Sequence, residues 1–193
     1  GIFNIDNYSA NSKRKINVLH FIYHGTISKR FDFKTVIKSF SMLKEDGVKF
    51  QYNIYGKGEY VSKLLALIKT YNLEKEVFYK GFYPIIEMPA KILKADVGIV
   101  SYEKSDATHL MFPLKLMEYI SMGIPVITIK NKSIGFYFDD SELLYYNYGD
   151  YQKLKNIILK IYKDPFVLNS LVDNCNRKLQ KFNWDIEKNI YVD

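Results

Sequence analysis

The sequence predicts an α/β fold in which a doubly wound, Rossmann-like parallel sheet carries helices on both faces. Two observations lead to this class. Short apolar runs typical of buried strands alternate with segments whose apolar residues recur at helical spacing. The connections between them are short, and three of the runs end in glycine. The first pair shows the pattern, because "INVLHFIYHG" at 16–25 reads as a buried strand and "DFKTVIKSFSMLKED" at 32–46 as an amphipathic helix.

The remaining elements follow in the same alternation. Strands are expected at 48–56, 76–81, 96–102, 125–129 and 142–146, and helices at 59–73, 86–95, 114–122 and from 151 to about 179. Asp164-Pro165 divides the last of these, since proline fits the first turn of a helix and not its interior. A short segment beginning at Trp184 closes the chain. No Pro/Gly/Ser-rich linker or internal repeat is present, so residues 1–193 are interpreted as one domain.

Composition places the chain among ordinary soluble globular proteins. Of its 193 residues, 48% are hydrophobic and 25% are charged. No apolar run approaches the roughly 20 residues that span a bilayer, and the first residues lack the apolar region of a signal peptide. Cys175 is the single cysteine, which excludes an intrachain disulfide and favours a reducing, cytoplasmic location. Because Cys175 has no His or Cys neighbours in the sequence, it is not expected to be a nucleophile or a metal ligand.

The formal charge of +7 raises the possibility of a polyanionic partner. The 28 Lys and Arg residues are, however, scattered along the chain and interspersed with 21 Asp and Glu residues. A solvated basic surface is therefore expected, and nucleic acid is not expected as a partner. A smaller anion, such as a nucleotide diphosphate, is compatible with this charge.

Three glycines mark the expected ligand side of the sheet. Gly25, Gly56 and Gly81 each end a predicted strand. In doubly wound folds the ligand lies beyond the carboxyl ends of the strands, where strand order reverses. Glycine at these ends permits either a tight turn or a close approach of the backbone to a ligand, and both interpretations stay open.

Lys115 and Glu118 interrupt the apolar stretch "FPLKLMEYISMGIPVI" at 112–127. Pro113 suits the first helical position and Gly123 the residue after the last turn, so a helix is expected between them. Its N-terminus would face the ligand side, where free N–H groups, the helix dipole and Lys115 favour phosphate. Glu118 could accept hydrogen bonds from two vicinal hydroxyls, such as those of a ribose. The alternative is a surface ion pair between the two residues, worth roughly 0.2–0.5 kcal/mol.

This stretch resembles the P-x-K-x-x-E-Y-x-x-x-G-x-P-V segment of GT-B glycosyltransferases, in the large retaining family 4, or group 1, that includes sucrose synthases and many bacterial capsule and lipopolysaccharide transferases. Three further segments resemble the same donor domain in the same order. They are "HGTISKRFDFKTVIKSF", "YNIYGKGEYVSKLLALIKTYNLEKEVFYKGFYP" and "MPAKILKADVGIVSY". The opening "GIFNID" resembles the loop after the interdomain linker. The order and spacing of these segments, rather than any one of them, carry the resemblance.

The resemblance implies that the chain is the C-terminal half of a longer enzyme, with the N-terminal acceptor domain absent and the fragment alone inactive. Its site would bind a nucleotide-diphospho-sugar. Glu118 matches the glutamate that bonds the ribose, and the turn from Phe112 to Lys115 meets the diphosphate and sugar. The implied donor-binding residues are Gly25, Thr26, Lys29, Arg30, Gly81, Phe82, Tyr83, Phe112, Pro113, Leu114, Lys115 and Glu118.

Two departures from the family pattern are present. The family usually has a further glutamate eight positions before Glu118, which contacts the donor sugar, and Leu110 occupies this position. The usual Gly-Arg after the first strand is Gly25-Thr26, so Lys29 or Arg30 would have to supply the phosphate charge from the same loop. The identity of the donor sugar therefore stays open.

The implied reaction is the retaining transfer of a hexose to an acceptor hydroxyl in bacterial surface polysaccharide or lipopolysaccharide synthesis. The protein would act mainly by stabilising the departing diphosphate, so no catalytic base is assigned. Neither a metal nor another cofactor is expected, because no His/Cys cluster has ligand spacing and "FDDSE" at 138–142 lacks a D-x-D order. The full-length enzyme would be cytoplasmic, with peripheral association at the inner face of the membrane as one implication of the family.

Other function classes remain alternatives. A sugar-nucleotide epimerase of the same architecture would need a paired histidine and acid, and His20, His24 and His109 offer little pairing with carboxylates in the sequence. A non-catalytic nucleotide-binding module of this fold is a second alternative, because fold alone does not determine function.

Overall fold

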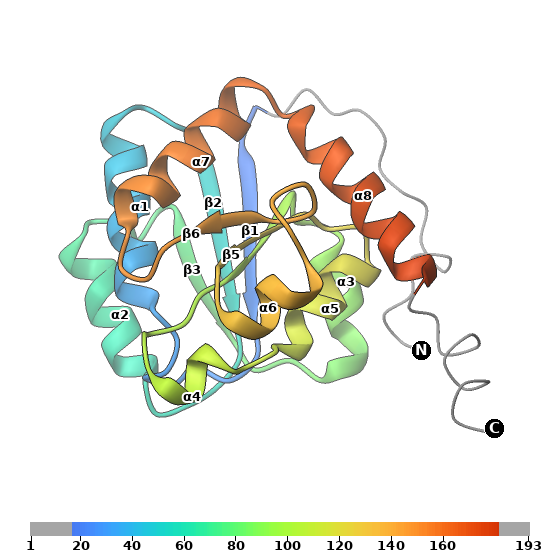
Figure 1. The fold of residues 1–193 in the computed structure, drawn as a ribbon. Coiled ribbons are helices and arrows are strands. Elements are labelled where there is room, and N and C mark those ends of the chain that lie inside the picture. Colours follow the sequence, from blue (N-terminus) through green and yellow to red (C-terminus); the bar gives the residue numbers. More distant parts are fainter. Residues whose placement is uncertain (1–16, 182–193) are drawn as a thin grey trace.

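The computed structural model describes residues 17–181, which form one six-stranded sheet covered by helices (Figure 1). The strands are β1 (Leu19–His24), β2 (Phe50–Tyr55), β3 (Val77–Gly81), β4 (Val97–Val100), β5 (Val126–Ile129) and β6 (Leu144–Tyr146). The helices are α1 (Phe33–Glu45), α2 (Val61–Thr70), the 3₁₀ turn η2 (Ile85–Glu87), α3 (Met88–Ile92), α4 (Asp106–His109), α5 (Leu114–Ser121), α6 (Lys132–Tyr137), α7 (Tyr151–Lys163) and α8 (Val167–Lys181).

The strand order is β3-β2-β1-β4-β5-β6, and every neighbouring pair is parallel. The chain moves outward from β1 to β3 and then returns to β4, on the other side of β1. This reversal places a crevice beyond the carboxyl ends of β1 and β4, which is where doubly wound sheets bind ligands. The predicted fold class, a Rossmann-like doubly wound parallel sheet, is confirmed.

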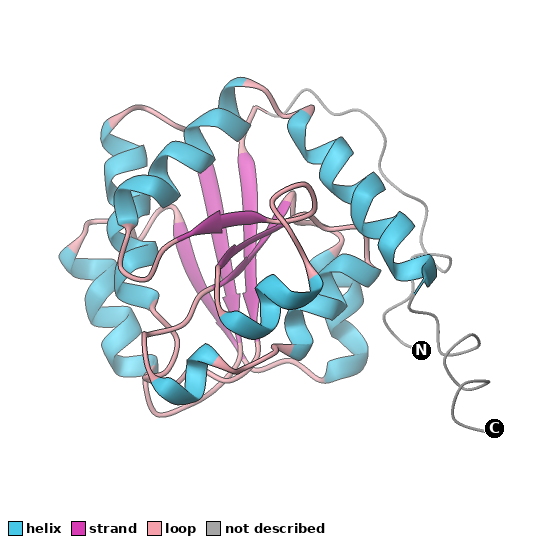
Figure 2. Ribbon diagram, viewed as in Figure 1, coloured by secondary structure: helices cyan, strands magenta, loops and turns pink. Residues whose placement is uncertain are grey.

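Helices cover both faces of the sheet. Helices α1, α2 and α7 lie on one side and α3, α5 and α8 on the other, so the strands are enclosed between two helical layers (Figure 2). Helix α7 packs on α1, and α8 packs on α5. Burial on both faces explains why β1, β4 and β5 read in the sequence as nearly continuous apolar runs.

Side-chain caps define where several helices begin. The Asp32 carboxylate accepts a hydrogen bond from the Thr35 N–H at 2.9 Å at the start of α1, and the Asp150 carboxylate accepts one from Lys153 N–H at 2.9 Å at the start of α7. Each of these satisfies a backbone donor that has no partner within its helix. Helix α7 ends at Lys163, as the Asp164-Pro165 pair predicts.

Some elements differ from the sequence prediction. Helices α4 and α6 were not predicted, because they span only Asp106–His109 and Lys132–Tyr137 and are too short to show a period. The helix expected at 86–95 is divided into η2 and α3. Pro113 is the residue before α5 rather than its first helical residue. The opening segment and Trp184 lie outside the described residues.

Cys175 is buried on α8, and its thiol donates to the Glu142 carbonyl at 3.3 Å. Burial raises the pKa of this thiol to about 12, which keeps it protonated and unreactive. Of the helices between residues 17 and 181, none has both the length and the apolar character that crossing a bilayer requires.

Candidate functional site

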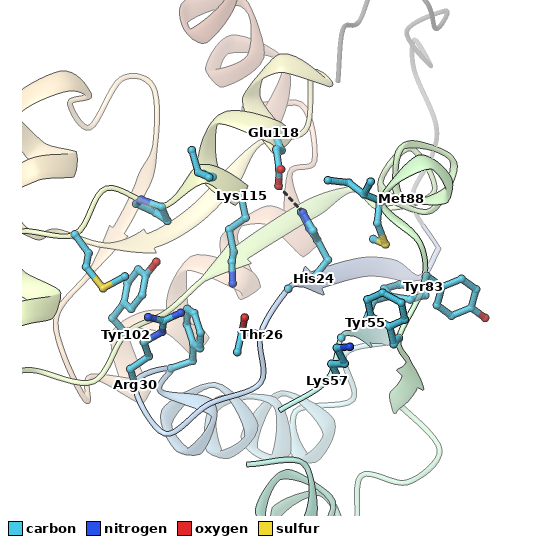
Figure 3. Close-up of a pocket in the computed structure, with 18 of the residues that line it drawn as sticks. His24, Thr26, Arg30, Tyr55, Lys57, Tyr83, Met88, Tyr102, Lys115 and Glu118 are labelled. Atoms are coloured by element: carbon cyan, nitrogen blue, oxygen red, sulfur yellow. Dashed lines mark hydrogen bonds and ion pairs between the residues drawn. The ribbon is translucent and has the colours of Figure 1, made fainter. Parts of the chain in front are cut away.

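A cavity of about 660 Å³ opens beyond the carboxyl ends of the strands, at the point where the strand order reverses (Figure 3). Loops after β1, β2, β3 and β4 form it, together with the turn that leads into α5. Its lining residues are His24, Gly25, Thr26, Arg30, Phe31, Tyr55, Gly56, Lys57, Phe82, Tyr83, Ile85, Met88, Tyr102, Met111, Phe112, Pro113, Leu114, Lys115 and Glu118.

Lys115 extends from the first turn of α5 into the middle of this cavity (Figure 3). Its ammonium nitrogen lies 3.9 Å from the centroid of the Tyr23 ring and 4.0 Å from that of the Phe31 ring. The residue is only 9% exposed, and no protein group within residues 17–181 is hydrogen-bonded to its Nζ. The two aromatic faces attract the cation, but they do not replace the hydrogen bonds that it makes in water.

The electrostatic setting makes this amine unusual. Burial lowers the pKa of Lys115 well below the usual value, nearby Arg30 lowers it further, and Glu118 acts in the opposite direction. The geometry leaves a buried nitrogen with three potential donors at the wall of the cavity and with no hydrogen-bond acceptor among residues 17–181. An anion at this position would supply the missing acceptors.

Glu118 lies one turn further along α5, and its carboxylate is hydrogen-bonded to His24 at the end of β1. The distance from His24 Nε2 to Glu118 Oε2 is 2.6 Å. The histidine side chain is 9% exposed and the glutamate side chain 23%, so the carboxylate is half-buried at the cavity wall. The sequence prediction that the histidines would pair little with carboxylates is wrong for His24, because its partner is 94 residues away in the chain.

Tyr119 anchors this pair from below. Its hydroxyl lies 2.9 Å from His24 Nδ1 and accepts a hydrogen bond from the His24 backbone N–H at 3.1 Å. The Tyr119 ring is fully buried against β4, where a β-carbon on Gly98 would lie 2.5 Å from a ring carbon. We call Lys115, Glu118, His24 and Tyr119 the buried corner of the site.

The glycines that end β1, β2 and β3 form interlocked turns beneath the cavity. Gly56 N–H donates to the Gly81 carbonyl at 2.8 Å, and Gly25 N–H donates to the Tyr55 carbonyl at 3.0 Å. Gly56 has a φ of 144°, and a β-carbon there would lie 1.8 Å from the Gly25 carbonyl oxygen. Close packing of one turn on another, together with a backbone conformation that other residues rarely adopt, explains this glycine.

The opposite end of the cavity is aromatic and open. Tyr55 and Tyr83 meet edge to face with ring centroids 5.4 Å apart, and Lys57 Nζ lies 4.6 Å from the Phe82 ring centroid. Phe82 is 61% exposed. We call Tyr55, Lys57, Phe82 and Tyr83 the aromatic rim of the site.

The structure brings most of the sequence-predicted residues together. Those that line the cavity are Gly25, Thr26, Arg30, Phe82, Tyr83, Phe112, Pro113, Leu114, Lys115 and Glu118. Two do not line it. Lys29 is exposed on the loop after β1, with its N–H donating to Glu59 at 3.1 Å, and Gly81 supports Gly56 from outside the cavity. A surface ion pair between Lys115 and Glu118 is not formed, because each side chain has different neighbours.

Several lining residues were missed by the sequence analysis. They are His24, Phe31, Tyr55, Lys57, Ile85, Met88, Tyr102 and Met111, whereas Gly56 was expected as a strand-end glycine on the ligand side. Position at a strand end was the sequence signal that could have identified some of these residues, because His24 and Tyr55 are the last residues of β1 and β2, and Tyr102 ends the predicted strand at 96–102. Among the residues that the structure describes, no group of three or more His, Cys, Asp or Glu side chains is arranged to hold a metal ion.

These features define a doubly wound α/β protein with its candidate site at the topological switch point. The chain belongs to the glycosyl transferases group 1 family, whose model matches residues 4–181. The predicted family is confirmed.

Curated relatives of the chain are glycosyltransferases of bacterial polysaccharide synthesis. The chain is 33% identical over 117 residues to the putative colanic acid biosynthesis glycosyltransferase WcaL of Escherichia coli K12, a match that covers 60% of this chain and 29% of that protein. It is 29% identical over 133 residues to the amylovoran biosynthesis glycosyltransferase AmsK of Erwinia amylovora, covering 65% of this chain and 31% of AmsK. The chain thus spans about a third of the length of these relatives.

Solved structures of low identity share the fold. HepE of Anabaena, determined in complex with UDP and glucose, superposes with a TM-score of 0.75 at 17% identity, over 91% of this chain and 48% of HepE. The C-terminal domain of a group 1 glycosyl transferase, LpcC of Francisella tularensis, superposes with a TM-score of 0.67 at 16% identity, over 84% of each chain. The sheet is therefore that of a GT-B glycosyltransferase domain.

Proposed function

We propose that this chain is the donor-binding half of a glycosyltransferase and that the cavity binds a nucleotide-diphospho-sugar. The observation that carries the proposal is the buried ammonium of Lys115, which has no hydrogen-bond partner in the part of the chain that the structure describes, with the Glu118 carboxylate one helical turn away. A single ligand that presents an anion and, a few ångströms further on, a pair of hydroxyls would satisfy both groups. A ribose attached to a diphosphate has this arrangement.

Positive charge on two sides of the cavity supports a diphosphate position between them. Lys115 Nζ occupies the middle, and Arg30 reaches in from the loop after β1 (Figure 3). No acidic group within residues 17–181 forms an ion pair with either side chain. The N-terminus of α5 points at the same place, and its dipole adds a favourable potential for phosphate.

We match the rest of the donor to the remaining groups of the cavity. Glu118 would accept hydrogen bonds from the ribose hydroxyls, and the aromatic rim would stack against the base. The diphosphate and the sugar would lie on the side of Lys115 away from Glu118, beside Arg30 and Tyr102 (Figure 3). Neither a metal nor another cofactor is required for this arrangement, because protein cations neutralise the phosphates.

The chemistry that follows is the retaining transfer of a hexose to an acceptor hydroxyl. The chain's own contribution is electrostatic, since Lys115, Arg30 and the α5 dipole stabilise negative charge as the diphosphate departs. The acceptor would be bound by a separate N-terminal half of the enzyme, so residues 1–193 alone are expected to bind donor without transferring sugar. Bacterial surface polysaccharide synthesis is supported as the setting by the names of WcaL and AmsK. The full-length enzyme would then act in the cytoplasm, in peripheral contact with the inner face of the membrane.

One observation favours a second function. The His24–Glu118 pair is the histidine–acid arrangement that a sugar-nucleotide epimerase of this architecture would need. Membership of the glycosyl transferases group 1 family supports transfer instead. Incubation of the chain with UDP-glucose, without acceptor, separates the two, because an epimerase would produce a second UDP-sugar detectable by NMR. A non-catalytic nucleotide-binding module would bind the nucleotide and leave the full-length protein without transfer activity.

Calorimetric titration with UDP, GDP and ADP tests the proposal directly. We expect saturable binding of one nucleotide, and a loss of about 100-fold in affinity in Lys115→Met, because a charge-assisted contact with phosphate is removed. Glu118→Ala is expected to weaken binding by about tenfold, for the ribose contacts.

Lys29→Met is the matched control. It removes a lysine from the same loop as Arg30 that does not line the cavity, and its affinity should stay within about twofold of the parent. Equal losses in Lys29→Met and Lys115→Met would mean that overall charge, rather than the cavity, binds the nucleotide. No binding of any of the three nucleotides would overturn the proposal.

A further inference from the structure

The donor-binding function proposed above uses Glu118 but gives no role to its hydrogen-bond partner His24. The histidine ends β1, and the glutamate lies on α5, so the two come together only through the sheet order. His24 is 7% exposed, yet it lines the cavity, and its ring points toward the Glu118 carboxylate (Figure 3). The effect of this buried imidazole on the carboxylate depends on which ring nitrogen carries a hydrogen atom.

The contacts of Tyr119 determine where those hydrogens lie. The Tyr119 oxygen accepts from the His24 backbone N–H at 3.1 Å, so the hydroxyl hydrogen is left to donate elsewhere. His24 Nδ1 is 2.9 Å away, whereas the Ile22 carbonyl is 3.5 Å away. Donation to Nδ1 makes this nitrogen an acceptor, and a neutral ring then carries its hydrogen on Nε2.

The result is the same if the ring is doubly protonated, because Nε2 carries a hydrogen in that state as well. In either case Nε2–H donates to Glu118 Oε2 over 2.6 Å, the length of a strong hydrogen bond to a charged group. Tyr119 itself cannot rotate, since its ring is fully buried beneath Gly98. The chain of contacts from the sheet to the carboxylate is therefore rigid.

We propose that His24 is a positioning residue of the donor site, which holds Glu118 by one oxygen so that the other oxygen faces the hydroxyls of the ligand. This inference rests on the proposed function, because it assumes that Glu118 receives ligand hydroxyls. The hydrogen bond from His24 also offsets the negative charge of a carboxylate that lies one helical turn from the predicted diphosphate position. Without it, Glu118 would be free to turn toward Lys115 and compete with the ligand for the ammonium.

The test compares the affinity of the chain for a ribonucleoside diphosphate with that for its 2′-deoxy form, both measured by calorimetry. UDP and dUDP are the first pair, followed by GDP with dGDP and ADP with dADP. The parent is expected to prefer the ribonucleotide by about tenfold, the effect of one hydrogen bond to a charged acceptor. Glu118→Ala removes that acceptor and should bring the ratio close to one.

Three variants then isolate the histidine. His24→Leu should reduce the ribo/deoxy ratio to about twofold, because Glu118 is no longer held. His24→Gln keeps an N–H donor near the position of Nε2 and should restore most of the ratio. His20→Gln, on the same strand but outside the cavity, should behave like the parent.

The outcomes separate the positioning role from a purely structural one. Thermal unfolding reports whether each variant folds, and a structural role predicts a lower melting temperature with an unchanged ribo/deoxy ratio in the folded protein. A parent-like ratio in His24→Leu, with the ratio lost in Glu118→Ala, would overturn the positioning role and leave the proposed function intact. A parent that binds no nucleotide would overturn both. Nucleotide binding without a ribo/deoxy preference would overturn the positioning role and the assignment of Glu118 to the ribose, and would leave donor binding intact.

Discussion

The buried corner and the aromatic rim line the same cavity but are built in opposite ways. In the buried corner, Tyr119 and the core around β1 and β4 determine where each polar atom lies. Lys115 Nζ has no hydrogen-bond partner there or elsewhere within residues 17–181. In the aromatic rim, Phe82 is 61% exposed and is contacted by the flexible amine of Lys57. The groups of the buried corner that recognise charge are therefore held in place before a ligand binds, whereas the contacts of the aromatic rim are completed when a ligand is bound.

The largest effect is expected in the interlocked glycine turns that follow β1 and β2. Gly56→Ala would place a β-carbon 1.8 Å from the Gly25 carbonyl oxygen at a φ of 144°. Because the two turns must separate, the free energy of unfolding should fall by about 3 kcal/mol or more, and nucleotide binding should be lost with it. Urea denaturation followed by circular dichroism measures the change.

Gly81→Ala is the matched control for that substitution. Its φ is 76°, but no atom lies within 4 Å of the position that a β-carbon would take. Only the backbone conformation is then strained, at a cost of about 1 kcal/mol. Equal losses in the two variants would show that φ alone, and not the contact between the turns, determines the requirement for glycine.

Lys115→Met is expected to separate binding from stability. The substitution removes a buried cation that has no hydrogen-bond partner among the described residues, while it keeps most of the side-chain volume between Tyr23 and Phe31. The free energy of unfolding should therefore stay constant or rise by about 1 kcal/mol, although nucleotide affinity falls. A fall of 2 kcal/mol or more on the same denaturation curves, again an order-of-magnitude limit, would mean that the aromatic faces fully compensate the buried charge.

The same lysine gives the stability a dependence on pH. Because the pKa of Lys115 is lowered in the folded state, the unfolded chain binds more protons between that lowered pKa and the usual lysine value of about 10.4. The parent should therefore gain stability relative to Lys115→Met as the pH rises through this window, with the full penalty present below it. Denaturation of both proteins at several alkaline pH values measures the difference, and parallel curves would contradict the lowered pKa.

Tyr119→Phe tests the anchor of the buried corner. Loss of the hydroxyl leaves the His24 backbone N–H without that acceptor, so the free energy of unfolding should fall by about 1–3 kcal/mol. Tyr145→Phe is the control, because its half-buried hydroxyl donates to the carbonyl of Phe138, neither residue lines the cavity, and the loss should cost about 1 kcal/mol or less. Only Tyr119→Phe should also reduce the preference for ribonucleotides in calorimetry.

The smallest effect is expected in the aromatic rim. Phe82→Ala removes an exposed ring and should change the free energy of unfolding by less than about 0.5 kcal/mol. If the rim stacks on the base, nucleotide affinity should still fall by about fivefold, within the range of one stacking contact. Phe166→Ala, a comparably exposed ring outside the cavity, is the control for both measurements.

The alternation of strands and helices, the glycines at the ends of β1 to β3, and the helix that carries Lys115 and Glu118 could all be predicted from the sequence. These features are local: side chains at helical or strand spacing, a proline before α5 and a glycine after it act within a few residues. A parallel doubly wound sheet follows from that alternation, because only crossover connections join parallel strands. The short helices α4 and α6 were not predicted, because segments of four and six residues are too short to show a helical period.

Which groups meet in the site depends on how the strands and helices pack together. Placement of β4 beside β1 brings α5 over the end of β1, and Glu118 thereby meets His24 across 94 residues of chain. The same packing turns Arg30 into the cavity and leaves Lys29 outside, although the two are adjacent in sequence. Whether Lys115 lies in solvent or between two aromatic rings also depends on contacts with Tyr23 and Phe31, far away in the chain. Spacing along a chain contains no information about such contacts, because they are set by the order in which the strands pack.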